Sequence, residues 1–481
     1  MSEEIELKLE VSPASVAALI ASDLIADQGS EVVLNATYFD TRSHELHRQG
    51  HSLRIRHAEG MAVQTVKSGD AAAGLFARGE WELPVDGRRP VADRRTPVSD
   101  LLGTRSDELL PLFDVVTSRH KVVVRSGGSE IEVAIDHAEA KAGSRSTVFC
   151  EVELELLAGD PSALFALART LDAIAHIRIS VQSKAERGYE LLGPLADFVR
   201  AEKTALVPTM DLPAAFAAIA ADCLRQYRLN ETILLDRYVP EAVHQARIGL
   251  RRLRSAMVLF KDLLAGPERD RLNAGLRDLA RCLGEARDLD VLVAEAQPGP
   301  VLERLSHARD SAHSAINRKL RAKTTRMLML DISEWIAAGS WRGDAATRTL
   351  RETPLSEFAA ARLDRLRRKL AKHGRHFADL EPEARHRVRK DTKKLRYGVE
   401  FLQPLFDAKA RRKKFARALE TLQDELGALN DRATAEERLA SLGLVGTQEV
   451  EEFLANWQTG NLLEAAADAR RALLDVKPFW R

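Results

Sequence analysis

The sequence predicts an α+β protein, with an antiparallel sheet in its N-terminal half and only helices in its C-terminal half. Three observations lead to this fold class. Short segments up to about residue 190 alternate polar and apolar residues at period two, which is typical of half-buried strands. After about residue 212, long segments rich in Ala, Leu and Arg follow helical spacing, with Gly or Pro at the breaks. The helical half also repeats one motif at a constant offset, which indicates two related helical bundles.

The chain has 481 residues, more than the roughly 250 to 300 at which single cores split, so we expect at least two domains. We predict a sheet domain over residues 1–200, a linker over residues 201–212 that contains VPTMDL, and a helical domain over residues 213–475. The hydrophobic fraction of 45% is ordinary for globular proteins and argues against disorder.

The sequence also argues against a membrane or secreted protein. The most apolar stretch near its start, SVAALIASDLIA, is interrupted by Asp23, and no basic segment precedes it. The three cysteines, Cys150, Cys223 and Cys282, lie far apart and show no C-x-x-C spacing. We therefore expect a cytoplasmic protein without a cysteine-based metal site.

The net charge of +1 conceals an asymmetry between the halves. Residues 1–204 carry a net charge of −9, and residues 205–481 carry +10. An acidic half suits metal cations and a basic half suits a polyanion.

The predicted strands are IELKLEV, SLRIRHA, AVQTVKS, GEWELPV, KVVVRS, EIEVAID and TVFCEVELELL, with helices near residues 12–23 and 161–175. Their polar positions carry both signs of charge, as in Glu4, Glu6 and Lys8 of the first strand. Exposure to water would explain one such strand. The recurrence in several strands favours a charged interior of a closed or nearly closed barrel.

Mixed charges of this kind match one class of ligand. Carboxylate oxygens suit Mg²⁺ or Mn²⁺, arginine forks bind phosphate oxygens in pairs, and the metal bridges the two. The sequence contains no G-x-x-x-x-G-K-[ST] motif, which argues against a P-loop nucleotide site.

An ordered set of motifs resembles the CYTH, or triphosphate tunnel metalloenzyme, family over about residues 3–195. The motifs are Glu4-x-Glu6-x-Lys8, YFDT at 38–41, LRIR at 53–56, TVK ending at Lys67, the pair Glu151 and Glu153, and SKAERGY at 183–189. The resemblance implies an antiparallel β-barrel tunnel with flanking helices, and an enzyme that cleaves or cyclises triphosphate compounds with a divalent metal.

The resemblance also implies roles for individual residues. The metal-binding residues would be Glu4, Glu6, Glu80, Asp136, Glu151 and Glu153, with Glu82 as an alternative register for Glu80. The triphosphate-binding residues would be Lys8, Arg54, Arg56, Lys67, Arg78, Arg119 and Lys184. Phosphoryl transfer needs mainly charge neutralisation and a positioned water, so we expect no covalent intermediate. Glu6 and Lys8 are the catalytic candidates, and which of them activates the water stays open.

The helical half contains HQARIGLRRLRSAMVLF at 244–260 and HRVRKDTKKLRYGVEFL at 386–402, at an offset of 142. A second echo, LGEARDLDVL and LGALNDRATA, follows at an offset of 143. His244, Arg247, Arg251 and Arg254 fall at steps of three and four, so they line one stripe of a helix. The same basic stripe in both repeats favours a groove that binds a polyanion over a merely solvated face.

The motif H-x-x-R-x-x-x-[RK]-[RK]-L-R, present twice, resembles the CHAD domain over about residues 213–475. The resemblance implies two pseudo-symmetric helical bundles that bind inorganic polyphosphate. The implied contacts are His244, Arg247, Arg251, Arg252, Arg254, His386, Arg389, Lys393, Lys394 and Arg396. Aromatic residues make up only 5% of the chain, which argues against nucleic acid, since base stacking would be poorly supplied.

Together these features predict metal-dependent hydrolysis of inorganic triphosphate to diphosphate and phosphate, joined to polyphosphate binding and an association with polyphosphate granules. Two alternatives remain at this point. One is a non-catalytic polyphosphate-binding or granule-targeting protein. The other is a nucleoside or thiamine triphosphatase, or an adenylate cyclase.

Overall fold

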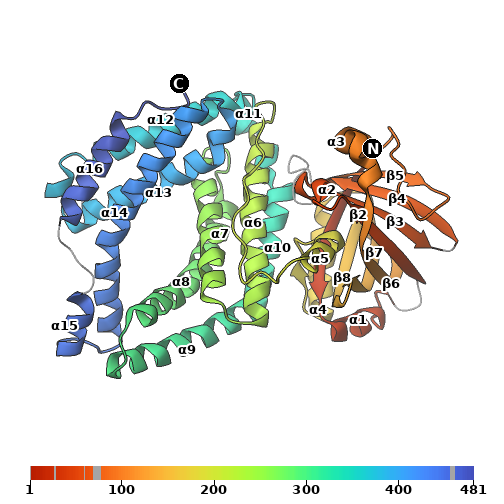
Figure 1. Cartoon of the computed structure of the whole chain (residues 1–481), viewed down its shortest axis with the longest axis horizontal. Coiled ribbons are helices and arrows are strands. Elements are labelled where there is room, and N and C mark those ends of the chain that lie inside the picture. Colours follow the sequence, from red (N-terminus) through yellow and green to blue (C-terminus); the bar gives the residue numbers. More distant parts are fainter. Residues whose placement is uncertain (1, 26–28, 59, 69–76, 456–460) are drawn as a thin grey trace. The chain divides into compact units, whose positions relative to one another are not determined.

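A computed structural model describes residues 2–25, 29–58, 60–68, 77–455 and 461–481 (Figure 1). The chain forms two compact units. The first unit contains Met1–Asp197 and Ala322–Ser340, and the second contains Phe198–Arg321 and Trp341–Arg481. The region predicted as helical over residues 213–475 therefore contributes one segment to the first unit.

The first unit is built on one antiparallel sheet, as the sequence predicts, with nine strands among the described residues. Their order is β5-β4-β3-β2-β6-β7-β8-β1-β9. The strands are β1 (Ser2–Val11), β2 (Ser30–Asp40), β3 (His51–Ala58), β4 (Met61–Ser68), β5 (Ala77–Pro84), β6 (Leu110–Ser126), β7 (Ser129–Ala142), β8 (Arg145–Ala158) and β9 (Arg178–Ile179).

The sheet curls but does not close along the length of its strands. Strand β1 pairs with β8 from Glu6 to Val11, and its first residues, Ser2 to Ile5, pair with β5. The two margins of the sheet thus meet only over this short stretch. The predicted barrel is therefore a loose description of a strongly curved sheet.

The helices of the first unit are α1 (Pro13–Ile20), α2 (Glu45–Arg48), α3 (Val98–Leu102), α4 (Ser162–Ile174), α5 (Lys184–Glu190) and α10 (Lys323–Ala338), with a 3₁₀ turn at Gly103–Glu108. Helices α1 and α4 confirm the two helices predicted near residues 12–23 and 161–175. Leu7 and Leu154 of the sheet pack with Leu171 of α4 and Leu330 of α10 in one apolar core. Helix α10 is thus part of the hydrophobic core of the sheet unit.

The opposite face of the sheet is apolar at one end, where α5 packs against it. Phe113, Phe149 and Tyr189 lie in this smaller core. A Cβ atom on Gly188 would lie 2.0 Å from the Phe113 ring, so only glycine permits this close approach. The packing fixes α5, and with it Lys184 at the first helical position, over the remainder of this face.

The second unit is helical, as predicted (Figure 1). Its helices are α6 (Leu212–Asp236), α7 (Pro240–Leu259), α8 (Pro267–Glu295), α9 (Pro300–Arg321), α11 (Arg348–Arg351), α12 (Leu355–His373), α13 (Pro382–Leu402), α14 (Lys409–Ser441), α15 (Gln448–Ala455) and α16 (Leu462–Asp475), with 3₁₀ turns at Ser340–Arg342, Ala345–Thr347, Phe377–Asp379 and Gln403–Leu405. The repeated motifs fall on α7 and α13, which pack together, and on α8 and α14. Across the described parts of the chain, no helix combines the length and the apolar character needed to span a membrane.

Candidate active site

Antiparallel register gathers charged residues of neighbouring strands on one face of the sheet. Asp136 on β7 lies opposite Arg119 on β6 and Glu151 on β8, and Lys8 on β1 lies opposite Glu153. Because successive side chains of a strand alternate between faces, the predicted residues at period two all join this face. We call it the charged face, and the predicted site residues that the structure describes on it are Glu6, Lys8, Arg54, Arg56, Lys67, Glu80, Arg119, Asp136, Glu151 and Glu153.

Three carboxylates form the centre of the charged face. Asp136, Glu151 and Glu153 each offer an oxygen within 4.8 Å of the others. Asp136 and Glu151 are fully buried. The Oε2 atom of Glu151 is buried and has no hydrogen-bond partner among the described residues. An arrangement of this kind, with an unsatisfied carboxylate oxygen, is suited to a divalent cation.

Lys184, Arg119 and Lys8 surround these carboxylates with positive charge. The Lys184 ammonium donates to Glu153 and pairs with Asp136, each at 2.8 Å, and it also contacts Glu151. Arg119 donates two hydrogen bonds of 2.7 Å to the two oxygens of Asp136 and also contacts Glu153. Charge balance is therefore supplied by side chains that could instead bind phosphate oxygens.

Lys8 joins the carboxylates of β1 and β8. Its ammonium donates to Glu6 at 2.8 Å and also contacts Glu153. Burial opposes the positive charge, but Glu153 and Glu6 outweigh it and raise the pKa of Lys8. The pKa of Lys184 is likewise raised, because Glu151 and Glu153 outweigh its burial. Both ammonium groups therefore keep their protons at neutral pH.

The two glutamates of β8 respond differently to this environment. Burial raises the pKa of Glu151, despite the nearby ammonium groups of Lys184 and Lys8. Glu153 is also buried, yet Lys184, Lys8 and Arg119 together hold its pKa well below the usual value. Glu153 is thus a permanent anion, whereas Glu151 is the carboxyl group whose charge a cation would have to stabilise.

A second group of charges lies on β3, β4 and β5. Glu80 lies 3.0 Å from the Lys67 ammonium and 4.0 Å from the Arg54 guanidinium. Glu82, the alternative to Glu80 considered from the sequence, pairs instead with Arg56 at 3.4 Å and is half exposed. Glu80 is therefore the more enclosed of the two and lies among the predicted phosphate ligands.

Two of the predicted residues have side chains outside the described part of the structure. Glu4 and Arg78 are paired in register between β1 and β5. Their backbone positions follow the same alternation as Glu6 and Glu80, and nothing further is described of their side chains.

The site residues assigned from the sequence do not include several other charged residues on the same face. Lys121 pairs with Glu132 at 2.6 Å, and Glu155 lies between Glu132 and Glu6 in the register of β7, β8 and β1. Arg187 of α5 donates to Glu10 of β1 at 2.9 Å. Each of these residues continues the period-two pattern or the helical turn of a predicted ligand, which is the signal that could have found them.

In the helical unit, four of the predicted basic residues come together. Arg247 and Arg251 of α7 lie near Arg389 and Lys393 of α13, and the positive charges of both α7 residues act on Arg389 and on Lys393. The Arg251 guanidinium donates to the Tyr397 hydroxyl at 2.7 Å, which joins α7 to α13. We call Arg247, Arg251, Arg389 and Lys393 the basic cluster.

Other residues of the predicted polyphosphate set lie differently. Arg252 is buried and donates to Glu400 at 2.7 Å and to Gln226 at 3.0 Å, so its guanidinium serves the packing of α6, α7 and α13. Arg254 donates to Asn273 and Arg396 to Gln423, each on the neighbouring helix of its repeat. Lys394 lies 3.5 Å from Asp391.

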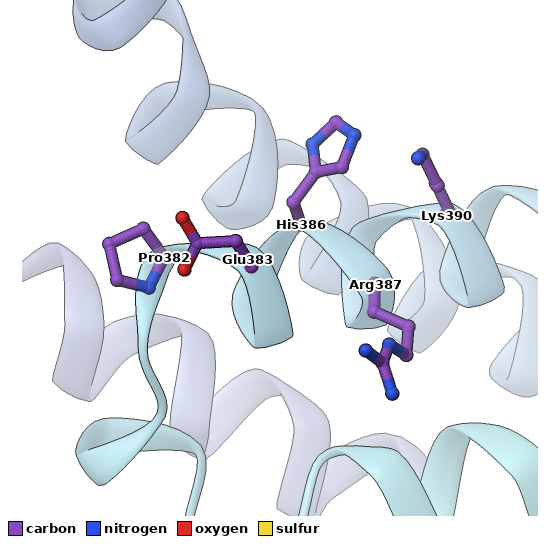
Figure 2. Close-up of a pocket in the computed structure, with 5 residues that line it drawn as sticks. All are labelled: Pro382, Glu383, His386, Arg387 and Lys390. Carbon is purple, nitrogen blue, oxygen red and sulfur yellow. The ribbon is translucent and has the colours of Figure 1, made fainter.

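The two histidines of the motif flank the basic cluster on α7 and α13. Burial and the nearby Arg287 lower the pKa of His244, and burial and Lys390 lower that of His386. Figure 2 shows an open pocket at the start of α13 that His386, Arg387 and Lys390 line together with Pro382 and Glu383. His386 and Lys390 point to the same side of the helix in this view, whereas Arg387 points away.

Comparisons with known proteins match one family model to the N-terminal half of the chain and another to the C-terminal half. A family model described as the CYTH domain matches residues 2–189, and one described as the CHAD domain matches residues 218–440. An inorganic triphosphatase of Haemophilus influenzae is 31% identical in an alignment of 247 positions that covers 48% of this chain and 69% of that protein.

Two further matches extend the comparison. An uncharacterised protein of Mycobacterium tuberculosis is 28% identical in an alignment of 431 positions that covers 82% of this chain and 81% of that protein. The crystal structure of the CHAD domain from Ricinus communis covers 59% of this chain and 98% of its own, with 28% identity and a TM-score of 0.50. From the charged face, the repeated basic helices and these matches together, we conclude that the chain belongs to the family of proteins that join a CYTH domain to a CHAD domain.

Proposed function

We propose that the sheet unit hydrolyses inorganic triphosphate to diphosphate and phosphate with Mg²⁺ or Mn²⁺, and that the helical unit binds inorganic polyphosphate. The observation that carries the first part is the cluster of Asp136, Glu151 and Glu153, within 4.8 Å of one another and in contact with Lys8, Arg119 and Lys184. The activity of the Haemophilus influenzae relative and the CYTH match support the same reaction.

The three carboxylates would hold the metal. Glu6 contacts the same Lys8 ammonium as Glu153, and Glu4 precedes Glu6 by two residues on β1. A divalent metal bound there would neutralise charge on the triphosphate and favour attack by water. Lys8, Arg119 and Lys184 already contact carboxylate oxygens, and each could exchange a carboxylate for a phosphate oxygen of similar charge. Arg54, Arg56 and Lys67 extend this set along the charged face.

Protonation separates the two candidates for the group that activates water. The raised pKa of Lys8 keeps it an ammonium at neutral pH, so it cannot accept a proton. Glu6, which accepts a hydrogen bond from Lys8, is therefore our choice for the acceptor that positions the attacking water. Lys8 would stabilise the charge that builds up on the phosphate oxygens.

Inorganic triphosphate is our leading substrate because the charged face supplies ligands for phosphate and metal along its strands. Nucleoside or thiamine triphosphates and cyclisation of ATP remain the alternative reactions within the enzyme class. A polyphosphate-binding protein without turnover would have no use for a buried, unsatisfied carboxylate such as Glu151.

The deciding experiment measures phosphate release from inorganic triphosphate, ATP, thiamine triphosphate and long-chain polyphosphate, each with Mg²⁺, Mn²⁺ or a chelator. We expect metal-dependent turnover that is fastest on inorganic triphosphate and falls by about 10²-fold or more in Glu153→Gln. The matched control is Glu139→Gln, an exposed glutamate on the other face of β7. Equal loss in both variants, or turnover that persists in the chelator, would contradict the proposed site.

Polyphosphate binding is proposed from the basic cluster, where three arginines and a lysine converge from both repeats. Its test is the triple variant Arg247→Ala, Arg251→Ala, Arg389→Ala, compared with Arg271→Ala, Arg281→Ala, Arg304→Ala on exposed positions of the same unit. We expect the first to weaken binding and to reduce its salt dependence, because each lost phosphate contact lowers the number of released counterions. Equal weakening by the control would contradict the assignment.

A further inference from the structure

Lys393 holds an unusual position in the basic cluster. It is half-buried on α13, and among the described residues it has no hydrogen bond or ion pair. Lysine ammonium groups that leave water normally find a carboxylate partner. Lys393 therefore lacks the usual compensation for its burial.

The groups that face Lys393 are mostly cations. Arg389 lies one turn earlier on α13, and Arg247 and Arg251 approach from α7. Asp431 of α14 is the nearby anion. The bond from Arg251 to Tyr397, which lies one turn after Lys393, holds the α7 guanidinium close to this part of α13.

The sequence repeat shows that Lys393 is an amine where the corresponding residue of the other repeat, Arg251, is a guanidinium. At the offset of 142, Arg389 corresponds to Arg247 and Lys393 corresponds to Arg251. Three of the four equivalent positions thus carry guanidinium groups, which remain charged at every accessible pH, whereas an amine can lose its proton. Lys393 is the member of the basic cluster that can release charge when no anion is present.

We propose that Lys393 takes up one proton when polyphosphate binds, so that the basic cluster binds the polyanion and a proton together. This inference rests on the proposed binding of polyphosphate by the helical unit. Phosphate oxygens placed among Arg247, Arg251 and Arg389 would supply the negative charge that an ammonium at position 393 requires. The neutral amine gains a proton from the solvent, and no phosphate bond is made or broken.

The electrostatics of the unliganded cluster support this linkage. Burial, followed by the charges of Arg389, Arg251 and Arg247, lowers the pKa of Lys393 from 10.5 to about 7. A bound polyanion favours the charged form and raises this pKa again. Affinity is therefore highest below pH 7, where the ammonium is already present, and falls as pH rises between the free and the bound pKa.

Calorimetry of polyphosphate binding to the full chain at pH 8, in buffers of different ionisation enthalpy, tests the proposal. We expect close to one more proton taken up by the wild type than by Lys393→Arg, in which the charge is permanent. Above pH 7 the affinity of the wild type should fall by up to about tenfold per pH unit relative to Lys393→Arg. At pH 8 the lowered pKa values of His244 and His386 keep both imidazoles largely neutral, and the comparison with the variant removes what remains.

Two further variants keep the test decisive. Lys393→Met, neutral at every pH, should bind more weakly than the wild type at pH 6 and show no such proton uptake at pH 8. Lys390→Arg, an exposed lysine one turn from His386, should behave as the wild type does. Equal proton uptake by the wild type and Lys393→Arg would overturn the proposal while leaving polyphosphate binding intact. Absence of any polyphosphate binding by the wild type would instead overturn the proposed function, and the inference with it.

Discussion

Replacement of Arg326 by methionine tests how firmly α10 is fixed to the sheet unit. Arg326 of α10 donates to both oxygens of Asp172 on α4, at 2.9 and 3.2 Å. The side chain of Asp172 is fully buried and that of Arg326 is 4% exposed. The same carboxylate accepts a hydrogen bond of 3.2 Å from the backbone N–H of Ile177, just before β9.

Arg326→Met leaves a buried carboxylate without its cation, a change that typically destabilises by about 3–5 kcal/mol. Arg326→Met combined with Asp172→Asn should recover much of this loss, because the asparagine is neutral and its oxygen can still accept from Ile177. The matched control is Arg169→Met, which removes the more exposed pairs of Arg169 with Asp331 and Glu334 and should cost only about 1 kcal/mol.

Amide hydrogen exchange of α10 in the full chain measures this cost locally, which is preferable because a two-unit protein need not unfold in one step. Fluorescence of the buried Trp335 on α10 provides a second readout. Unchanged exchange of α10 in Arg326→Met, or a double variant as destabilised as the single one, would refute this reasoning.

Three other changes have distinct expected outcomes. Gly188→Ala places a methyl group against Phe113 and should displace α5 with Lys184, which raises KM for triphosphate and destabilises the sheet unit by about 1–3 kcal/mol. Gly193→Ala, which has open space around it, should do neither. Equal KM values in the two variants would contradict the packing argument. Arg252→Met should lower the thermal stability of the helical unit but leave the salt dependence of polyphosphate binding unchanged, since its guanidinium is buried; a smaller salt slope would show that it does contact phosphate. Burial raises the pKa of Glu151 above its ordinary value in the folded protein. The free energy of unfolding of the metal-free protein should therefore be highest below the ordinary pKa of a glutamate and fall as pH rises above it and the buried carboxyl group ionises. Glu151→Gln should abolish this fall in thermal melts over a series of pH values, and an unchanged pH profile would contradict the assignment.

The sequence was sufficient for the charged face because a strand alternates its side chains strictly. Glu6, Lys8, Glu151 and Glu153 could therefore be assigned to one face without coordinates. The partner of each charge could not be predicted, since it depends on the register between strands far apart in the chain, as for Lys121 with Glu132.

Helical spacing was less decisive. For Arg252 the spacing was informative, because it follows Arg251 directly and so lies about 100° further around α7, away from the basic stripe. The resemblance to the CHAD domain had nevertheless included it among the polyphosphate contacts. The amphipathic pattern of α10 predicts a buried face but not the unit against which it packs, because helices and sheets accept the same apolar stripe. The membership of α10 in the sheet unit required the structure.

The position of α10 affects the order in which the protein can fold during synthesis. The last strand of the sheet, β9, ends at Ile179, whereas α10 begins at Lys323. While the intervening residues are still on the ribosome, Asp172 lacks the guanidinium of Arg326 and the apolar core lacks Leu330. The sheet unit therefore cannot complete its apolar core until α6 to α9 have been synthesised and α10 has left the ribosome. Its folding thus depends on synthesis of helices that belong to the other unit.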